Sequence, residues 1–284
     1  MTKFCRITLS AMQVEGFVSH NIYGHSTPAT FIGFTTAFAL SMANELKKEV
    51  EVYEDKYKNS LLDLNSGIVS IFHFCEEYAK GSFGKTDLSG WKKKGSSFVS
   101  ATIMDNPKLN EKVSILFQLD DQITDEDTFS QQLFEKCFNK ALSKLRFGGG
   151  YIKDYSFSIV SDLKTLVKNT PVGFVMKKDL TTVDSIDSLL DEVTSEIGTG
   201  WKTATLLGYA LVETPSIKDY SRLGKEHAFA EPLIGLVEFE YVNKKNYQNI
   251  FEVGWIVDFK EPTEKDHGVV FYETIETKTK KQGI

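Results

Sequence analysis

Residues 129–160 read FSQQLFEKCFNKALSKLRFGGGYIKDYSFSIV, and a helical pattern meets a strand pattern within them. From Phe129 onward the apolar side chains recur at i, i+4, i+5, i+8 and i+9, which is the spacing of an amphipathic helix. Three glycines at 148–150 end this pattern, and residues 151–160 have the composition of a strand. The stretch therefore predicts a helix, a glycine-rich end to that helix and a strand, in that order.

The residues before this stretch predict a second helix and four strands. Pro28 opens a segment in which phenylalanine and leucine recur at close to helical spacing, so we expect a helix over residues 29–50. Period-two alternation and β-branched content predict strands over residues 4–9, 66–74, 97–104 and 112–119, the last two around the turn DNPKLNE. Strand, helix, strand, strand, helix, strand, with one extra hairpin strand, is the ferredoxin-like plan, which RNA-recognition modules share.

The second half of the chain has weaker periodicity. It predicts an acidic helix over residues 183–197 and strands over residues 172–177, 204–212, 233–242 and 269–274. A second sheet and a continuation of the first sheet fit these strands equally well. We therefore expect an α+β fold with a ferredoxin-like core over residues 1–160. A C-terminal extension over residues 161–284 should pack on the same core.

The composition is that of a cytoplasmic protein whose contacts with nucleic acid are local. Of its 284 residues, 41% are hydrophobic, which is enough for a large core. No stretch approaches the length of a membrane helix, and the N-terminus lacks the layout of a signal peptide, so we expect no membrane partner. The formal net charge of −6 argues against a protein that coats nucleic acid through a general basic surface.

The cysteines argue against a disulfide framework and against a zinc site. Cys5, Cys75 and Cys137 stand far apart, with no C-x-x-C pair and no regular histidine spacing, so we expect buried free thiols. The common nucleotide-binding, zinc-peptidase and hydrolase motifs are also missing from the sequence. We therefore expect neither a cofactor nor a metal.

The first candidate site is Arg146 together with Gly148, Gly149 and Gly150. A backbone with three glycines can pass very close to a ligand, and the amide groups of such a turn can receive phosphate. Arg146 would add a forked hydrogen-bond donor. A helix C-cap explains the same glycines without any ligand, because one glycine is enough for a cap.

The second candidate site is Trp91 with Lys92, Lys93 and Lys94, in the predicted connection between the strand at 66–74 and the next hairpin. An aromatic face beside three ammonium groups can stack a base and hold phosphates. A solvated lysine loop is the alternative interpretation.

Two histidines complete the candidates. His25 lies in the loop after the first strand and His73 near the end of the apolar strand IVSIFHF, so they could form a general acid and base pair. No Ser, Cys or Tyr nucleophile is tied to either histidine by spacing. A hydrogen-bonded structural role is the alternative for a histidine in an apolar strand.

Several segments resemble, in order, those of one protein family. Residues 23–34 (YGHSTPATFIGF) resemble its Gly-x-Pro-x-x-Thr-Ala-Phe-x-Gly-Phe segment, and residues 67–73 resemble its apolar strand ending in His. Residues 112–116, 146–149 and 229–235 resemble its later landmarks. On these segments the chain resembles the Csy-type, Cas-five-like subunit of type I-F CRISPR surveillance (Cascade) complexes, in the RAMP superfamily. The family's Trp-rich C-terminal segment is not recognisable, which indicates a diverged or shortened variant.

This resemblance implies a noncatalytic subunit that binds the 5′ repeat-derived handle of a guide RNA (crRNA). Its other partners would be the backbone and large subunits of the effector complex. Target DNA would be reached only through the complex, because guide pairing reads its sequence. We expect the RNA contacts at Arg146, Gly148, Gly149, Gly150, Trp91, Lys92, Lys93, Lys94, His25 and His73.

Three other functions stay open on the sequence. A backbone-type subunit of the same superfamily would bind in several copies along one guide RNA. An RNA-processing endonuclease would use His25 or His73 as acid or base and would cleave repeat RNA without a metal. A ferredoxin-like module that binds a small molecule or a protein would have no RNA partner.

Overall fold

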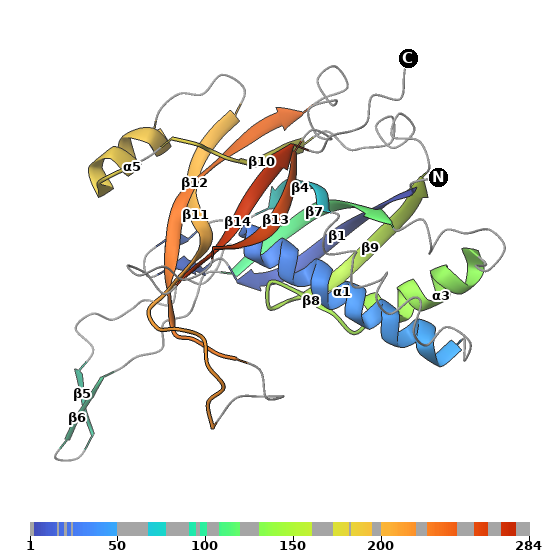
Figure 1. The fold of residues 1–284 in the computed structure, drawn as a ribbon, viewed down its shortest axis with the longest axis horizontal. Helices are drawn as coiled ribbons and strands as arrows, with labels where there is room; N and C mark the ends of the chain where they lie inside the picture. The colour runs from blue at the N-terminus through green and yellow to red at the C-terminus, as the bar shows by residue number, and fades with distance from the viewer. Residues whose placement is uncertain are drawn as a thin grey trace.

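The computed structural model describes residues 3–15, 17–19, 22–23, 25–49, 68–77, 91–94, 97–100, 108–119, 131–160, 173–181, 183–194, 200–219, 226–242, 253–260 and 268–276. Over these ranges the chain has a mixed α+β fold, as the sequence predicts (Figure 1). No helix within them is both long enough and apolar enough to cross a membrane.

The N-terminal half contains two helices and most of one sheet. Its elements are β1 (Lys3–Glu15), β2 (Phe17–Ser19), β3 (Ile22–Tyr23), α1 (Pro28–Glu49), β4 (Ile68–Glu77), β5 (Trp91–Lys94), β6 (Ser97–Ser100), β7 (Lys108–Leu119), α3 (Gln131–Leu142), β8 (Arg146–Phe147) and β9 (Gly150–Val160). The C-terminal half adds β10 (Gly173–Lys178), α5 (Ile186–Thr194), β11 (Gly200–Leu211), β12 (Ala230–Val242), β13 (Val253–Lys260) and β14 (Val269–Glu276).

Ten of these strands form one antiparallel ladder. Their order is β8, β9, β1, β7, β4, β10, β12, β11, β14 and β13, so the C-terminal strands continue the first sheet. The continuation is narrow, because β4 and β10 pair only at Phe174 with His73 and at Val175 with Phe72. The ladder therefore has an N-terminal part from β8 to β4 and a C-terminal part from β10 to β13.

The C-terminal part curls back towards the N-terminal part. Its last strand in the ladder, β13, lies against β4 although the two are not paired. Trp255 of β13 is fully buried there, and its indole N–H donates to the carbonyl oxygen of Met176 in β10 at 3.0 Å. This one side chain links two strands that stand four places apart in the ladder.

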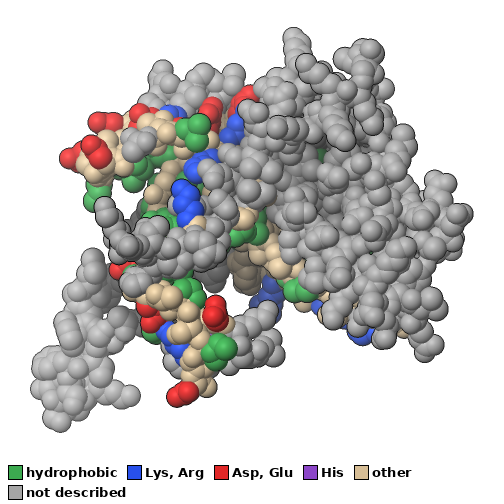
Figure 2. Space-filling model, in the orientation of Figure 1, with side chains coloured by type: hydrophobic (Ala, Val, Ile, Leu, Met, Phe, Trp, Pro, Cys, Tyr) green, Lys and Arg blue, Asp and Glu red, His purple; other side chains and the backbone are tan. Residues whose placement is uncertain are grey.

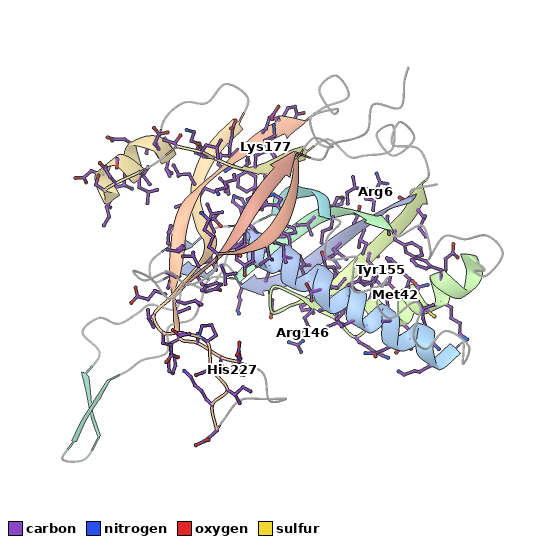
Figure 3. The ribbon with its side chains drawn as sticks, in the orientation of Figure 1. Arg6, Met42, Arg146, Tyr155, Lys177 and His227 are labelled. Carbon is purple, nitrogen blue, oxygen red and sulfur yellow. The ribbon has the colours of Figure 1, made fainter. Side chains whose placement is uncertain are left out.

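Helices α1 and α3 cover one face of the N-terminal part. Alternate residues of β1 are buried on that face, namely Cys5, Ile7, Leu9 and Ala11. Phe138 of α3 packs between Phe38 of α1 and Phe157 of β9, with ring centroids 4.9 and 3.8 Å apart. Figure 3 shows Arg6 of β1 on the side of the sheet away from Met42 of α1. The sheet thus has one apolar face under the helices and one face without them.

Glu45 of α1 joins the two helices through charge. Its carboxylate accepts hydrogen bonds from Lys144, just after α3, and from Lys48 at 2.8 Å, and these bonds lower the pKa of Glu45 from 4.5 to about 2. A pKa below its unfolded value stabilises the fold above about pH 4.5, and this contribution is lost as the pH falls towards 2. We expect Glu45→Gln to flatten the decline in melting temperature over that interval, measured by circular dichroism. Identical pH profiles for both proteins would contradict this role.

Three expectations about strands were wrong. Residues 108–111 of the predicted turn belong to a strand, because β7 begins at Lys108 and pairs with β1 from there, with Leu109 and Glu111 buried. β6 pairs instead with β5, so residues 91–94 form a strand and not a loop. Only two residues separate these strands, a spacing typical of a β-hairpin. β13, whose sequence includes glycine, aspartate and lysine, was not predicted at all.

Three short strands also differ from the predictions, since β2 and β3 lie where a loop was expected and β8 lies at the predicted end of a helix. β1 runs to Glu15, six residues beyond its predicted end, while α1, β4, β7, β9, β10, β11, β12 and β14 agree with their predicted ranges to within a few residues. The acidic helix predicted over residues 183–197 is α5, Ile186–Thr194, and residues 195–197 of that prediction lie outside the described residues. Cys5 and Cys137 are buried free cysteines, as expected, and the side chain of Cys75 lies outside the described residues.

Candidate nucleic-acid interface

The three glycines do not end helix α3. That helix stops at Leu142, and Gly148 and Gly149 instead connect β8 to β9, whose first pair is Phe147 with Gly150. The φ angles of Gly148 and Gly149 are +50° and +76°, the left-handed values that a two-residue hairpin turn requires at both positions. The C-cap interpretation is therefore wrong, and the glycines serve a β-hairpin.

The hairpin packs tightly on the end of β1. A β-carbon on Gly150 would lie 2.5 Å from the carbonyl oxygen of Met12 and 2.7 Å from the nitrogen of Val14. A β-carbon on Gly148 would lie 2.6 Å from the Val14 side chain and 3.2 Å from Thr30 of α1. The close approach predicted for the glycines does occur, but the neighbour is the protein's own chain.

A buried carboxylate fixes the loop that leads into α1 beside this hairpin. Glu111 of β7 accepts hydrogen bonds from the amide of Ser26 at 3.0 Å and from its hydroxyl at 2.6 Å. The hydroxyl of Thr27 then accepts from the amide of Thr30 at 3.3 Å and caps the helix, with Pro28 at its first position. The end of β1, the start of α1 and the glycine turn are therefore held together.

Arg146 and Tyr151 face each other across the hairpin. They are a register pair of β8 and β9, and both side chains are exposed. Phe147 points the other way, into the core, with its ring 5.3 Å from Phe31 and 5.4 Å from Phe34 of α1. The Tyr151 hydroxyl reaches the sulfur of Met12 at 3.3 Å. Figure 3 shows Arg146 at the outer edge of the sheet, below α1.

Polar side chains continue from this pair along the helix-free face. Directly paired residues of antiparallel strands share a face, so the register places on it Arg6, Thr8, Ser10, Lys112, Ser114, Ser156 and Ser158, together with the buried Leu116, which pairs with Arg6. Thr8 and Ser114 share a hydrogen bond of 2.8 Å between their hydroxyls. Burial lowers the pKa of Arg6, but a guanidinium keeps its charge in proteins. This face offers hydroxyl and cationic groups beside the buried Leu116 and Ser114.

The other predicted residues are not all near this site. His25 precedes Ser26 in the loop beside the glycine turn, and its ring packs 5.0 Å from Phe239 and 5.9 Å from Trp201. His73 lies in β4 at the narrow join to β10. Figure 1 shows the β5–β6 hairpin, with Trp91, Lys92, Lys93 and Lys94, apart from the main sheet and from β8. The side chains of β4 and β5 lie outside the described residues.

The structure therefore brings the glycine turn and the His25 loop together and leaves the other two candidates elsewhere. Tyr151 and Arg6 were not predicted as site residues. The alternation Arg6, Thr8, Ser10 in the first predicted strand was a signal for a polar sheet face. The pairing of Tyr151 with Arg146 needed the hairpin register, which the sequence did not provide.

No group of three or more His, Cys, Asp or Glu side chains in the described ranges is placed to hold a metal ion. No family model matches this sequence, and no curated protein matches it either. The function has to be inferred from the geometry of the interface and from its chemistry.

Proposed function

We propose that this chain is a noncatalytic RNA-binding protein with a ferredoxin-like core. The strand order β9, β1, β7, β4, with α1 between β1 and β4 and α3 between β7 and β9, supports that design for residues 1–160. In such modules the sheet face away from the helices receives single-stranded RNA. On the helix-free face here Arg6, Ser10 and Lys112 are partly exposed, and the adjacent hairpin adds the exposed Arg146 and Tyr151.

The pairing of exposed Arg146 with exposed Tyr151 is the observation that carries the proposal. A base can stack on the face of a tyrosine ring, and a guanidinium can donate two hydrogen bonds to a phosphate. Both groups sit on a hairpin that is anchored by Phe147 and by close glycine packing, so little ordering is needed on binding. Local contacts of this kind are compatible with an acidic chain.

The family resemblance of the sequence indicates which RNA the chain would bind. A subunit of a type I-F-like CRISPR surveillance complex would hold the 5′ repeat-derived handle of the guide RNA, with the backbone and large subunits as neighbours. We propose that the chain has this role in the cytoplasm and that target DNA is met only through the assembled complex.

Two substitutions test the proposal. We expect Arg146→Ala and Tyr151→Ala each to lower RNA affinity by about tenfold, since charged hydrogen bonds and base stacking each contribute roughly 1–3 kcal/mol. Losing one phosphate contact should also lower the slope of log affinity against log salt by about 0.7, so Arg146→Ala should change this slope and Tyr151→Ala should not. The measurement is fluorescence anisotropy with labelled RNA at several salt concentrations.

The RNA for this assay comes from co-expression with a CRISPR repeat transcript and candidate partner subunits, followed by sequencing of the RNA that stays bound. Lys136→Ala, an exposed cation on α3 across the sheet, serves as the matched control and should leave affinity unchanged. Trimming of the RNA by the purified chain would favour the endonuclease, and several copies per RNA would favour a backbone subunit. Recovery of no RNA under any condition would overturn the proposal.

A further inference from the structure

Helix α5 is amphipathic, yet it buries no residue. Ile186 and Leu190, one turn apart on the same side, are 76% and 55% exposed. Leu189 and Val193 are partly covered, which leaves the other half of the apolar face towards solvent. Leu180, just after β10, is 83% exposed. We call Ile186 and Leu190 the α5 apolar stripe.

Polar contacts hold the helix in place in the absence of a core of its own. Lys202 of β11 makes ion pairs of 2.7 Å with Glu192 of α5 and with Asp179 at the end of β10. Ser185 caps the first turn by accepting a hydrogen bond from the amide of Ser188 at 3.1 Å. A nine-residue helix has little stability alone, so these contacts present the apolar stripe in an already ordered form.

The margin of the stripe is acidic. Asp184, Asp187 and Asp191 are exposed, and the last turn of the helix carries no basic residue. Figure 1 places α5 at the opposite end of the molecule from α3, and Figure 2 shows hydrophobic and acidic side chains gathered over it. The surface therefore combines apolar anchors with one sign of charge.

We propose that the α5 apolar stripe is a docking surface for a segment of a partner protein that carries apolar side chains flanked by lysine or arginine. In protein–protein complexes, apolar contacts contribute most of the affinity, and opposite charges orient the partners and raise the association rate. A second copy of this chain would bring the same acidic margin against itself, which opposes association. RNA and anionic lipid are repelled for the same reason. The docking surface is independent of the RNA interface at Arg146.

The test uses the full chain and two fluorescein-labelled synthetic helical peptides. Both peptides carry leucines at i, i+3 and i+4 spacing, and their flanking positions are lysines in one and glutamates in the other. We expect saturable binding of the lysine peptide and none of the glutamate peptide. The double substitution Ile186→Asp with Leu190→Asp should lower affinity at least ~10-fold, as loss of central anchors does.

The matched control is Val212→Asp with Ile217→Asp, two other exposed apolar residues outside α5, which should leave peptide binding unchanged. Asp187→Asn with Asp191→Asn should weaken binding and reduce its salt dependence. Equal binding of both peptides, or binding that ignores the α5 substitutions, would overturn the proposal. So would a dimer in light scattering that the α5 double substitution abolishes, since the occupant would then be a second copy. RNA affinity should be the same in all these variants.

Discussion

Replacing Gly150 with alanine is expected to lower the free energy of unfolding by about 3 kcal/mol, the upper end of the usual cost of overpacking. The added β-carbon would lie 2.5 Å from the Met12 oxygen, 2.7 Å from the Val14 nitrogen and 2.9 Å from the Gln13 carbonyl carbon. All three atoms belong to the main chain of β1, which is held here by the pairs Met12 with Tyr151 and Val14 with Leu109, and main-chain atoms have no rotamer by which to yield. Urea denaturation followed by circular dichroism measures the change.

Two other glycines provide the controls. Gly33 lies in α1 with nothing within 4 Å of an added β-carbon, so Gly33→Ala should stabilise the protein by up to about 1 kcal/mol. Gly149 is exposed with φ of +76°, so Gly149→Ala should cost about 1–2 kcal/mol for backbone conformation alone. If Gly150→Ala were no more costly than Gly149→Ala, the packing of this hairpin on β1 would not explain the glycine.

The glycine substitutions test a structural role, which differs from the binding role proposed for Arg146 and Tyr151. The glycine turn is explained by the hairpin and by its contact with β1, without any ligand. Arg146 and Tyr151 have no such structural requirement, since both are exposed and the adjacent Phe147 provides the anchor. The substitutions at these two positions should therefore change RNA affinity while leaving the free energy of unfolding nearly unchanged.

Helices were the most predictable part of the fold. The helix expected over residues 29–50 is α1, Pro28–Glu49, because proline marks its start and apolar residues recur over several turns. The amphipathic pattern after Phe129 likewise corresponds to α3, although the glycines that seemed to end it belong to the next hairpin. A helix can be predicted from its own sequence, because its starting residue and its recurring apolar residues lie within one continuous segment.

Strand pairing was not predictable in the same way, because it depends on residues far apart in the chain. The join of β4 to β10 brings Phe72 beside Val175, and nothing local to either residue indicates the other. Glu111 shows the same limit, since its partner Ser26 is 85 residues away. A carboxylate inside a strand is usually solvated, so burial of Glu111 could not be expected from the sequence alone.

Arg146 and the glycines, which the sequence analysis grouped on grounds of chemistry and of chain flexibility, lie together in one hairpin, and their contact with RNA stays a prediction. The aromatic residue beside Arg146 was not predicted, because the sequence pointed to Trp91 in a separate candidate site, whereas Tyr151 stands directly opposite Arg146. The two-residue turn sets the register that pairs Arg146 with Tyr151. A helix C-cap at the same glycines would have left these two residues unpaired.

Replacing Trp255 with alanine is expected to cost about 3–5 kcal/mol, the usual range for a large aromatic residue in a core. Its side chain is fully buried in β13, the strand that curls back against β4, and it donates a hydrogen bond to Met176 of β10. Trp255→Phe keeps a ring but removes the donor, so a smaller loss of about 1–3 kcal/mol should follow. Thermal and urea unfolding of both variants provide the measurement, and an unchanged midpoint in Trp255→Ala would contradict the packing described.

The shape of the Trp255→Ala transition also tests how the two parts of the ladder depend on each other. The core under α1 and α3 is continuous with Met176, Phe239 and Trp255 of the C-terminal part, although β10 meets β4 through only two residue pairs. If one cooperative transition moves to lower denaturant, β13 and its indole couple the parts into a single folding unit. If two transitions separate, with helical signal lost only in the second, residues 1–160 fold as a domain and the C-terminal strands are added to it. Because the Arg146 interface lies wholly in the N-terminal part, RNA binding should survive the first of those transitions.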